Sequence, residues 1–164
     1  MASLNGTISL NTALRYEGSN PYGGPRFDSA LALSHSIGAG VGANQADVFY
    51  QSEHTISSGG SLAIDLTSDL DAAGVAMAMV ELVGVVVFNR SIAGTDNSTS
   101  LTVGGGTHPV ISSITVNPGG ILYMLAPDAS GLAAVADGST DKLNIVNGAG
   151  AAATVQVVLI GRRT

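Results

Sequence analysis

The side chains with the widest chemical use in this chain are its three histidines, His35, His54 and His108. Histidine serves as a general base and as a zinc ligand, but a zinc site needs partner ligands at short, regular spacings. The three histidines lie far apart, and none has a ligand-like neighbour. The chain also has no cysteine, so thiolate ligands, cysteine nucleophiles and disulfides are excluded. We predict no metal site and three scattered structural histidines.

The densest group of carboxylates is Asp65, Asp69 and Asp71. Carboxylate oxygens in a loop are suited to Ca²⁺, but the spacing of an EF-hand and its closing glutamate are missing. Aspartate side chains also accept hydrogen bonds from backbone amides in turns. The group therefore predicts a solvated turn.

Glycine-rich segments occur at Gly38-x-Gly40-x-Gly42 and at Gly104-Gly105-Gly106. Neither carries the Lys-Ser/Thr pair of a phosphate-binding loop, so both predict turns or hinges. There is no Gly-x-Ser-x-Gly elbow, and no pair of carboxylates stands out for glycoside hydrolysis. The sequence predicts a protein that is not an enzyme and needs no cofactor.

The composition points toward contact with other proteins. Hydrophobic residues make up 45% of the 164 residues, whereas charged residues make up only 11%, which is sparse for the surface of a free monomer. The net charge of −6 argues against direct binding of nucleic acid, because phosphate binding needs clustered Lys and Arg. We predict an oligomer or a docked subunit.

The N-terminal residues have neither the positive region nor the apolar region of a signal peptide. The longest apolar run, residues 75–88, contains Glu81 and is too short to span a bilayer. We therefore expect a soluble, non-secreted chain that does not insert into a membrane.

Short β-type segments separated by Gly, Pro, Asn and Asp turns fill the chain beyond residue 47, which predicts an all-β sandwich or barrel. Residues 75–89 are ambiguous, because Ala76 to Met79 favour a helix while Val85 to Phe88 favour a strand; we assign one long strand, bulged at Gly84. The predicted strands cover residues 3–10, 48–56, 61–66, 75–89, 98–103, 114–116, 121–125, 131–135, 143–146 and 154–160.

Residues 16–46 are rich in Gly and Pro and show little periodicity. We interpret them as an extended arm with one short strand or helical turn near residues 29–36, so that residues 1–46 form an N-terminal strand and arm and residues 47–164 form the body. Loops of this length are usually functional or are held by a neighbour. The candidate interface is a loose aromatic cluster, with core filling as its alternative role. Its members are Tyr16, Tyr22, Phe27 and Tyr50.

The succession of strand and turn segments over residues 60–161 resembles that of small virion structural proteins of tailed bacteriophages, in particular jelly-roll head decoration (cement) proteins. The segments that carry the resemblance are Phe88-Asn89-Arg90-Ser91, Ser100-Leu101-Thr102-Val103-Gly104-Gly105, Ile114-Thr115-Val116-Asn117-Pro118-Gly119-Gly120, Leu125-Ala126-Pro127-Asp128-Ala129-Ser130-Gly131, Leu143-Asn144-Ile145-Val146-Asn147 and Val157-Val158-Leu159-Ile160-Gly161.

The resemblance implies a jelly-roll body that forms a homotrimer and binds the major capsid protein on the outside of a phage head, after assembly in the host cytoplasm. Such a subunit acts by burying surface across capsid subunits, which stabilises the shell. Two alternatives stay open. One is a tail or baseplate adaptor, and the other is a carbohydrate-binding β-sandwich used for host attachment.

Overall fold

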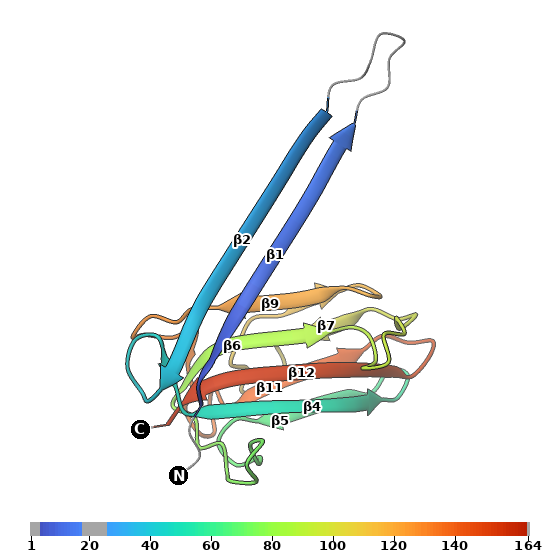
Figure 1. The fold of residues 1–164 in the computed structure, drawn as a ribbon. Coiled ribbons are helices and arrows are strands. Elements are labelled where there is room, and N and C mark those ends of the chain that lie inside the picture. The colour runs from blue at the N-terminus through green and yellow to red at the C-terminus, as the bar shows by residue number, and fades with distance from the viewer. Residues whose placement is uncertain (1–3, 18–25, 164) are drawn as a thin grey trace, which may run out of the picture.

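The computed structural model describes residues 4–17 and 26–163 (Figure 1). All regular secondary structure within these ranges is β-strand. The strands form a body of packed sheets and a long hairpin that projects from it, which confirms the predicted all-β sandwich. The strands are β1 (Gly6–Glu17), β2 (Arg26–Ala39), β3 (Gln45–Ala46), β4 (Val48–Ile56), β5 (Ser61–Asp65), β6 (Glu81–Phe88), β7 (Leu101–Val103), β8 (Ile114–Val116), β9 (Ile121–Leu125), β10 (Ala133–Ala134), β11 (Lys142–Asn147) and β12 (Ala153–Arg162).

The body consists of a five-stranded and a four-stranded sheet. In the five-stranded sheet β4, β12 and β6 lie side by side, and β9 and β10 pair with successive parts of the other edge of β6. The order in the four-stranded sheet is β5-β11-β7-β8. All pairings within the two sheets are antiparallel.

The strand pairs of the body are nested along the chain. The first long strand, β4, pairs with the last, β12, and β5 pairs with β11. Inside these pairs, β6 pairs with β9 and β7 with β8. The chain of the body is thus one long antiparallel ribbon that has been rolled up, and β12–β6 and β11–β7 are the contacts where the roll closes on itself.

The core lies between the two sheets and is built from alternate residues of their strands. In β12, Val155, Val157 and Leu159 are fully buried, and the side chains between them point out of the sandwich. In β11, Leu143 and Ile145 are fully buried in the same way. A period of two is the pattern expected for strands with one face on a core.

The strand predicted over residues 75–89 is wrong in its first half. Residues 75–80 are irregular, with a positive φ of 43° at Ala78, and they send the buried side chains of Met77 and Met79 into the core. The strand begins at Glu81. A bulge was predicted at Gly84, and the structure has it one residue earlier, at Val83: Ile160 pairs with Gly84 and Gly161 pairs with Leu82, so Val83 is an extra residue in β6.

The N-terminal segment also differs from its prediction. Strand β2 has 14 residues, where one short strand or helical turn near residues 29–36 was predicted. Tyr16, placed in the irregular arm, belongs to β1. The region therefore consists mostly of two long strands in its described part, with a turn at residues 40–44, and the turn-rich composition concealed these strands.

Candidate assembly surface

Strands β1 and β2 form a hairpin, hereafter the arm, that runs out from one end of the body and extends past it (Figure 1). Every residue of β1, from Gly6 to Glu17, pairs with a residue of β2. At about 3.4 Å per residue, the 12 residues of β1 span about 40 Å. An isolated two-stranded hairpin is marginally stable in water, so an arm of this length calls for a partner.

The two faces of the arm differ in character, because residues directly opposite each other in an antiparallel pair share a face. Leu10 lies opposite Leu33, and Tyr16 lies opposite Phe27. The residues between these pairs turn the other way. The apolar face thus carries Ile8, Leu10, Leu14, Tyr16, Phe27, Leu31, Leu33 and Ile37, together with Gly6, Thr12, Ser29 and His35, and the polar face carries Thr7, Ser9, Asn11, Ala13, Arg15, Glu17, Arg26, Asp28, Ala30, Ala32, Ser34 and Ser36.

The apolar face is open to solvent beyond its base. Leu14 is 71% exposed, Tyr16 71% and Phe27 70%, and Leu31 is 52% exposed. Large apolar side chains at such exposures on adjacent positions form a patch rather than scattered surface residues. An uncovered patch of this kind marks a contact surface.

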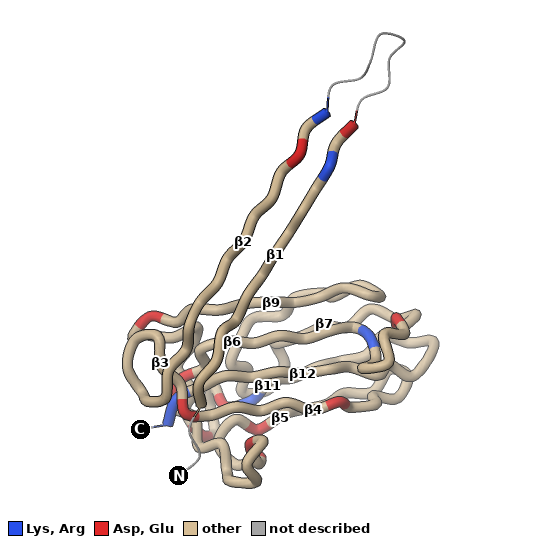
Figure 2. Tube along the Cα trace, viewed as in Figure 1, with Lys and Arg blue, Asp and Glu red and all other residues tan. Residues whose placement is uncertain are grey.

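The charges of the arm gather at its outer end, as Figure 2 shows, and lie on the polar face. Asp28 accepts hydrogen bonds from Arg15, at 3.1 Å, and from Arg26, at 2.7 Å. All three side chains are more than half exposed, so each ion pair contributes about 0–1 kcal/mol. These pairs leave the apolar face without charge.

The base of the arm is packed on the outer face of the five-stranded sheet. Ile37 belongs to a small apolar cluster with Val83 and Ile160, and Ile8 packs against it. The bulge in β6 makes this contact possible. It turns the extra residue, Val83, toward the cluster under the arm, while Leu82 before it and Val85 after it point into the core between the sheets. The arm is therefore anchored at one end by the same face that is open further out.

Arg162 ties the base to the body. Its side chain is 1% exposed, and its guanidinium donates to the backbone oxygens of Gln45, Pro127 and Asp128 and to the carboxylate of Glu81, the last at 2.7 Å. Gln45 belongs to β3, which pairs with the end of β2. One buried cation thus joins the root of the arm, the end of β12 and the loop after β9.

The outer face of the five-stranded sheet is apolar near the arm and more polar away from it. One cross-strand row, Leu125, Gly84, Ile160 and Phe49, lies under the base. The next row consists of Tyr123, Val86, Val158 and Gln51. An apolar recess of about 220 Å³ lies between these rows and the arm, and its lining includes Ile8, Phe49, Val86, Tyr123, Leu125 and Val158.

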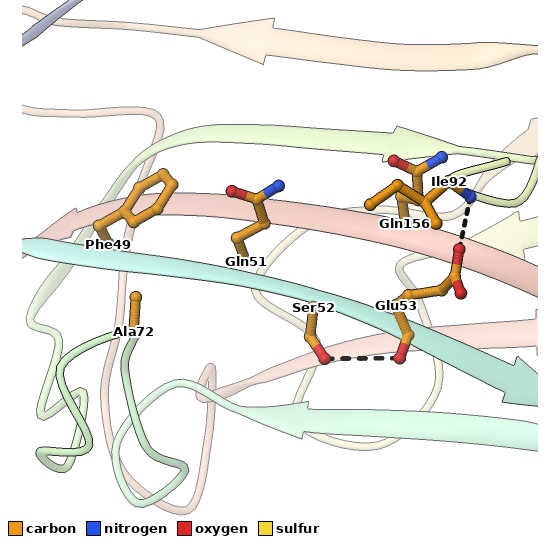
Figure 3. A pocket seen from close by; sticks show the side chains of 7 residues that line it. All are labelled: Phe49, Gln51, Ser52, Glu53, Ala72, Ile92 and Gln156. Carbon is orange, nitrogen blue, oxygen red and sulfur yellow. Dashed lines mark hydrogen bonds between the residues drawn. The ribbon is translucent and has the colours of Figure 1, made fainter. Parts of the chain in front are cut away.

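A second recess, of about 410 Å³, lies further along the same face, beside β4. Figure 3 shows Phe49, Gln51 and Gln156 following one another along the sheet. The carboxylate of Glu53 accepts a hydrogen bond from the backbone amide of Ile92, and the amide of Gln156 donates to the oxygen of Arg90. This recess offers one aromatic ring and several hydrogen-bonding groups.

The structure divides the predicted aromatic cluster. Tyr16 and Phe27 are opposite each other at the outer end of the arm, whereas Tyr22 lies outside the described residues. Tyr50 is buried in the core, where its hydroxyl is 2.7 Å from Nε2 of His54 and its ring stacks on the imidazole. The burial of Tyr50 favours its core-filling alternative over a role in an interface.

The histidines do not converge. His35 lies on the arm, His54 is held beside Tyr50, and Nδ1 of His108 is 3.5 Å from the carboxylate of Asp141. Burial lowers the pKa of His54, against a smaller opposing effect of Asp69. In the part of the chain that the structure describes, no group of three or more metal-ligating side chains comes together.

The acidic group is structural in its contacts. Burial would raise the pKa of Asp65, but the Lys142 ammonium at 2.8 Å and the hydrogen bonds from Thr67 and Ser68 outweigh it and hold this pKa well below its usual range. Asp71 likewise accepts hydrogen bonds from backbone amides and from Arg163, at 2.7 Å, and its pKa is lowered. These carboxylates fasten turns, as the sequence predicted, but the side chain of Asp71 is only 6% exposed, so the turn is not the solvated one that was expected.

Leu14, Leu31 and Leu33 of the arm were not singled out from the sequence, although a signal for them exists. In β1 the large apolar residues stand at even positions from Ile8 to Tyr16, which is the period of a strand with one apolar face. In β2 the alanines at positions 30 and 32 fill the gaps between larger residues and hide that period.

Comparison with known proteins gives no assignment: no protein family, no curated protein and no solved structure matches this chain. Within residues 4–17 and 26–163, no helix is long and apolar enough to cross a membrane. The arm, the recesses and the body that carries them are therefore the features that bear on function.

Proposed function

We propose that this chain is a structural assembly protein, namely a capsid decoration (cement) protein that binds the outside of a phage head as a homotrimer and stabilises the shell. The observation that carries the proposal is the arm. It presents an uncovered apolar face of leucine and aromatic side chains, while the body has a filled core of its own. A chain built in this way gains stability when its arm is covered by another protein surface.

The nested strand pairs support a finer interpretation of the body as a jelly roll. With the long body strands lettered B to I in chain order, β10 apart, one sheet has the order B-I-D-G and the other C-H-E-F. That order is what results when an eight-stranded antiparallel ribbon is rolled into two sheets. Jelly rolls are used in viral capsids and in lectins, so the fold is compatible with the proposal but does not select it alone.

Stabilisation of a head would follow from linkage. A protein that binds the assembled shell, and not its separated subunits, shifts the equilibrium toward the shell by an amount that grows with its occupancy. Such a role depends on buried area and repetition, and it uses the major capsid protein as partner. Reinforcement against the internal pressure of packaged DNA is the expected benefit.

The test is sedimentation of the full chain with purified, undecorated heads, followed by heating of the loaded heads. Saturable binding at a fixed number of copies per head, together with a higher temperature of head disruption, is the expected result. Failure to co-sediment at micromolar concentration would overturn the proposal. A ring-sized mass in solution without head binding would instead favour a tail or baseplate adaptor.

The recess beside β4 favours a second candidate, a carbohydrate-binding sandwich. Phe49 offers a ring for the apolar face of a sugar, and Gln51 and Gln156 offer amides for its hydroxyls. A glycan array separates the candidates, since binding that is lost in Phe49→Ala would support attachment to a host surface.

A further inference from the structure

We propose that the apolar face of the arm lies on the outer face of the five-stranded sheet of a second copy of this chain, so that neighbouring copies exchange arms. This deepens the assembly role proposed above by naming the arm's partner, and it rests on that proposal only in treating the arm as an assembly element. Binding to a head is not required for it.

The first argument is that one chain carries both surfaces. The donor is the apolar face of the arm from Leu10 outward, which is exposed. The acceptor is the apolar recess of about 220 Å³ beside the arm's base, whose lining contains Val86, Val158 and Tyr123 and no charged side chain. The arm extends beyond the body (Figure 1), and of its described residues only Thr7 and Ile8, at its base, line the recess, so the outer part of a copy's own arm does not fill it.

The second argument is continuity with a contact that already exists within the chain. At the base, Ile8 and Ile37 belong to the apolar face and pack on the outer face of the sheet, against Val83 and Ile160. The exposed residues continue the same face of the same hairpin. A neighbour's arm on this sheet would repeat the packing of arm on sheet that already occurs within one chain at the base of the arm.

The third argument is the chemistry and size of the patch. The charges of the described part of the arm lie on its polar face, so the apolar face offers no ion pair to a phosphate or to another charged ligand. With about 150–250 Å² for a fully exposed aromatic residue and somewhat less for a leucine, the partly exposed apolar side chains of the arm present roughly 600 Å². Specific interfaces bury about 800 Å² per partner, so one arm supplies most of that area, and a reciprocal dimer, in which a single interface holds two arms, exceeds it.

The exchange also constrains the symmetry of the assembly. Because donor and acceptor are different surfaces, the contact is heterologous, and it leaves no arm uncovered only if it closes into a ring or is reciprocated in a two-fold dimer. A closed trimer satisfies this requirement with three equivalent contacts.

The test uses the absence of native cysteines in this chain. One full-length variant carries Leu31→Cys on the apolar face of the arm, and another carries Val158→Cys in the recess. The two are mixed, exchanged overnight and treated with a short bismaleimide. We expect a cross-linked dimer that contains one chain of each kind, and no such product when Ala32→Cys, on the polar face of the arm, replaces Leu31→Cys.

Lysine variants of the full chain give an independent readout by light scattering. Leu31→Lys and Val158→Lys should each convert the oligomer to a 16.3 kDa monomer, whereas Ala32→Lys and Thr115→Lys, which lies on β8 of the other sheet, should leave its mass unchanged. A circular dichroism spectrum like that of the unmodified chain verifies folding.

The outcomes separate this inference from the proposed function. Cross-linking of Leu31→Cys only to itself would show that arms pack on arms, and would overturn the exchange. A monomer that still binds heads through its arm would overturn it as well, while leaving the decoration role in place. Conversely, arm exchange in a protein that ignores heads would support this inference and refute the decoration role.

Discussion

The arm and the body are built from the same kinds of residue, yet they are stabilised in opposite ways. In the body, alternate residues of two sheets meet each other, so that side chains such as Leu159 are fully buried. In the arm the same alternation produces a single apolar face, and Leu14 is left 71% exposed. A period of two thus makes a core only where a second sheet lies opposite. The arm has the pattern of half a sandwich.

The polar groups follow the same division. Buried amides in the body have their hydrogen bonds satisfied: Asn147 donates to the backbone oxygens of Ile56, Ser57 and Ala151 and accepts from Thr99. The ion pairs of the arm are exposed at its outer end. We infer that the body folds without a partner, while the order of the arm depends on the surface that covers it.

The largest effect is expected where the two regions are joined. Arg162→Met removes a buried guanidinium that contacts Gln45, Glu81, Pro127 and Asp128. The Glu81 carboxylate loses its ion pair, whereas the oxygens of Pro127 and Asp128 keep the backbone amides of Asn44 and Gly131. We expect a loss of about 3–5 kcal/mol in the free energy of unfolding. Chemical denaturation measures it, and hydrogen exchange of residues 38–46 should accelerate because the root of the arm is released.

The control for this change is Arg90→Met. Arg90 is partly exposed and pairs with Asp96 at 3.5 Å, so its replacement should cost under about 1 kcal/mol. Equal losses in the two variants would mean that Arg162 does not join the regions in the way its contacts indicate.

A matched pair of leucines tests the comparison directly. Leu159→Ala empties a fully buried site between the sheets and should lower the free energy of unfolding by about 2–5 kcal/mol. Leu14→Ala removes the same atoms from an exposed site on the arm, so we expect a change within about 0.5 kcal/mol when unfolding is followed in dilute, monomeric protein. In concentrated protein, Leu14→Ala should weaken association more than Leu159→Ala does. A loss of about 2–5 kcal/mol for Leu14→Ala in the monomer would show that the arm is covered by its own chain.

The strand positions of the body were largely predictable because its turns contain the residue types that turns favour, namely Asn, Asp, Pro and Gly. Segments such as Asn117-Pro118-Gly119-Gly120 and Asn147-Gly148 bound strands whose positions the structure confirms, among them β8 and β9. The strand pairing was not predictable, since it depends on which ribbons meet after folding rather than on any local pattern. The irregular path of residues 75–80 was missed for the same reason: Met77 and Met79 are held there by the core that they fill.

The candidate surface was predictable only in part. The aromatic residues Tyr16 and Phe27 were singled out, but the leucines between the tip and the base were not, because alanine neighbours obscured the alternation in β2. Tyr50 looked equivalent to the other aromatics in the sequence, and only the pairing of β4 with β12 places it inward. Residue type identified the possible contacts, and the register decided which of them are exposed.

The smallest expected effect concerns pH and belongs to the body. The pKa of Asp65 is lower in the folded chain than the value of about 3.9 expected on unfolding, so its contribution is present above about pH 4 and is lost as the pH falls below that value. Asp65→Asn should lower the free energy of unfolding by about 1 kcal/mol at pH 6, because the carboxylate is 24% exposed and its pair with Lys142 is partly screened. It should also flatten the fall of Tm between pH 5 and pH 2.5.

Asp28→Asn supplies the matched change on the arm, where the carboxylate is 54% exposed and its ion pairs are screened. Thermal unfolding of both variants across that pH range separates the two regions, since only the body holds a partly buried carboxylate at an ammonium group. If Asp28→Asn flattened the acid dependence as much as Asp65→Asn, the arm would contribute to the cooperative unit that unfolds, and the contrast between a self-sufficient body and a dependent arm would be lost. We expect instead that the acid limit of the fold is set in the body, where the pKa values of Asp65 and Asp71 are lowered, while the arm responds to its partner.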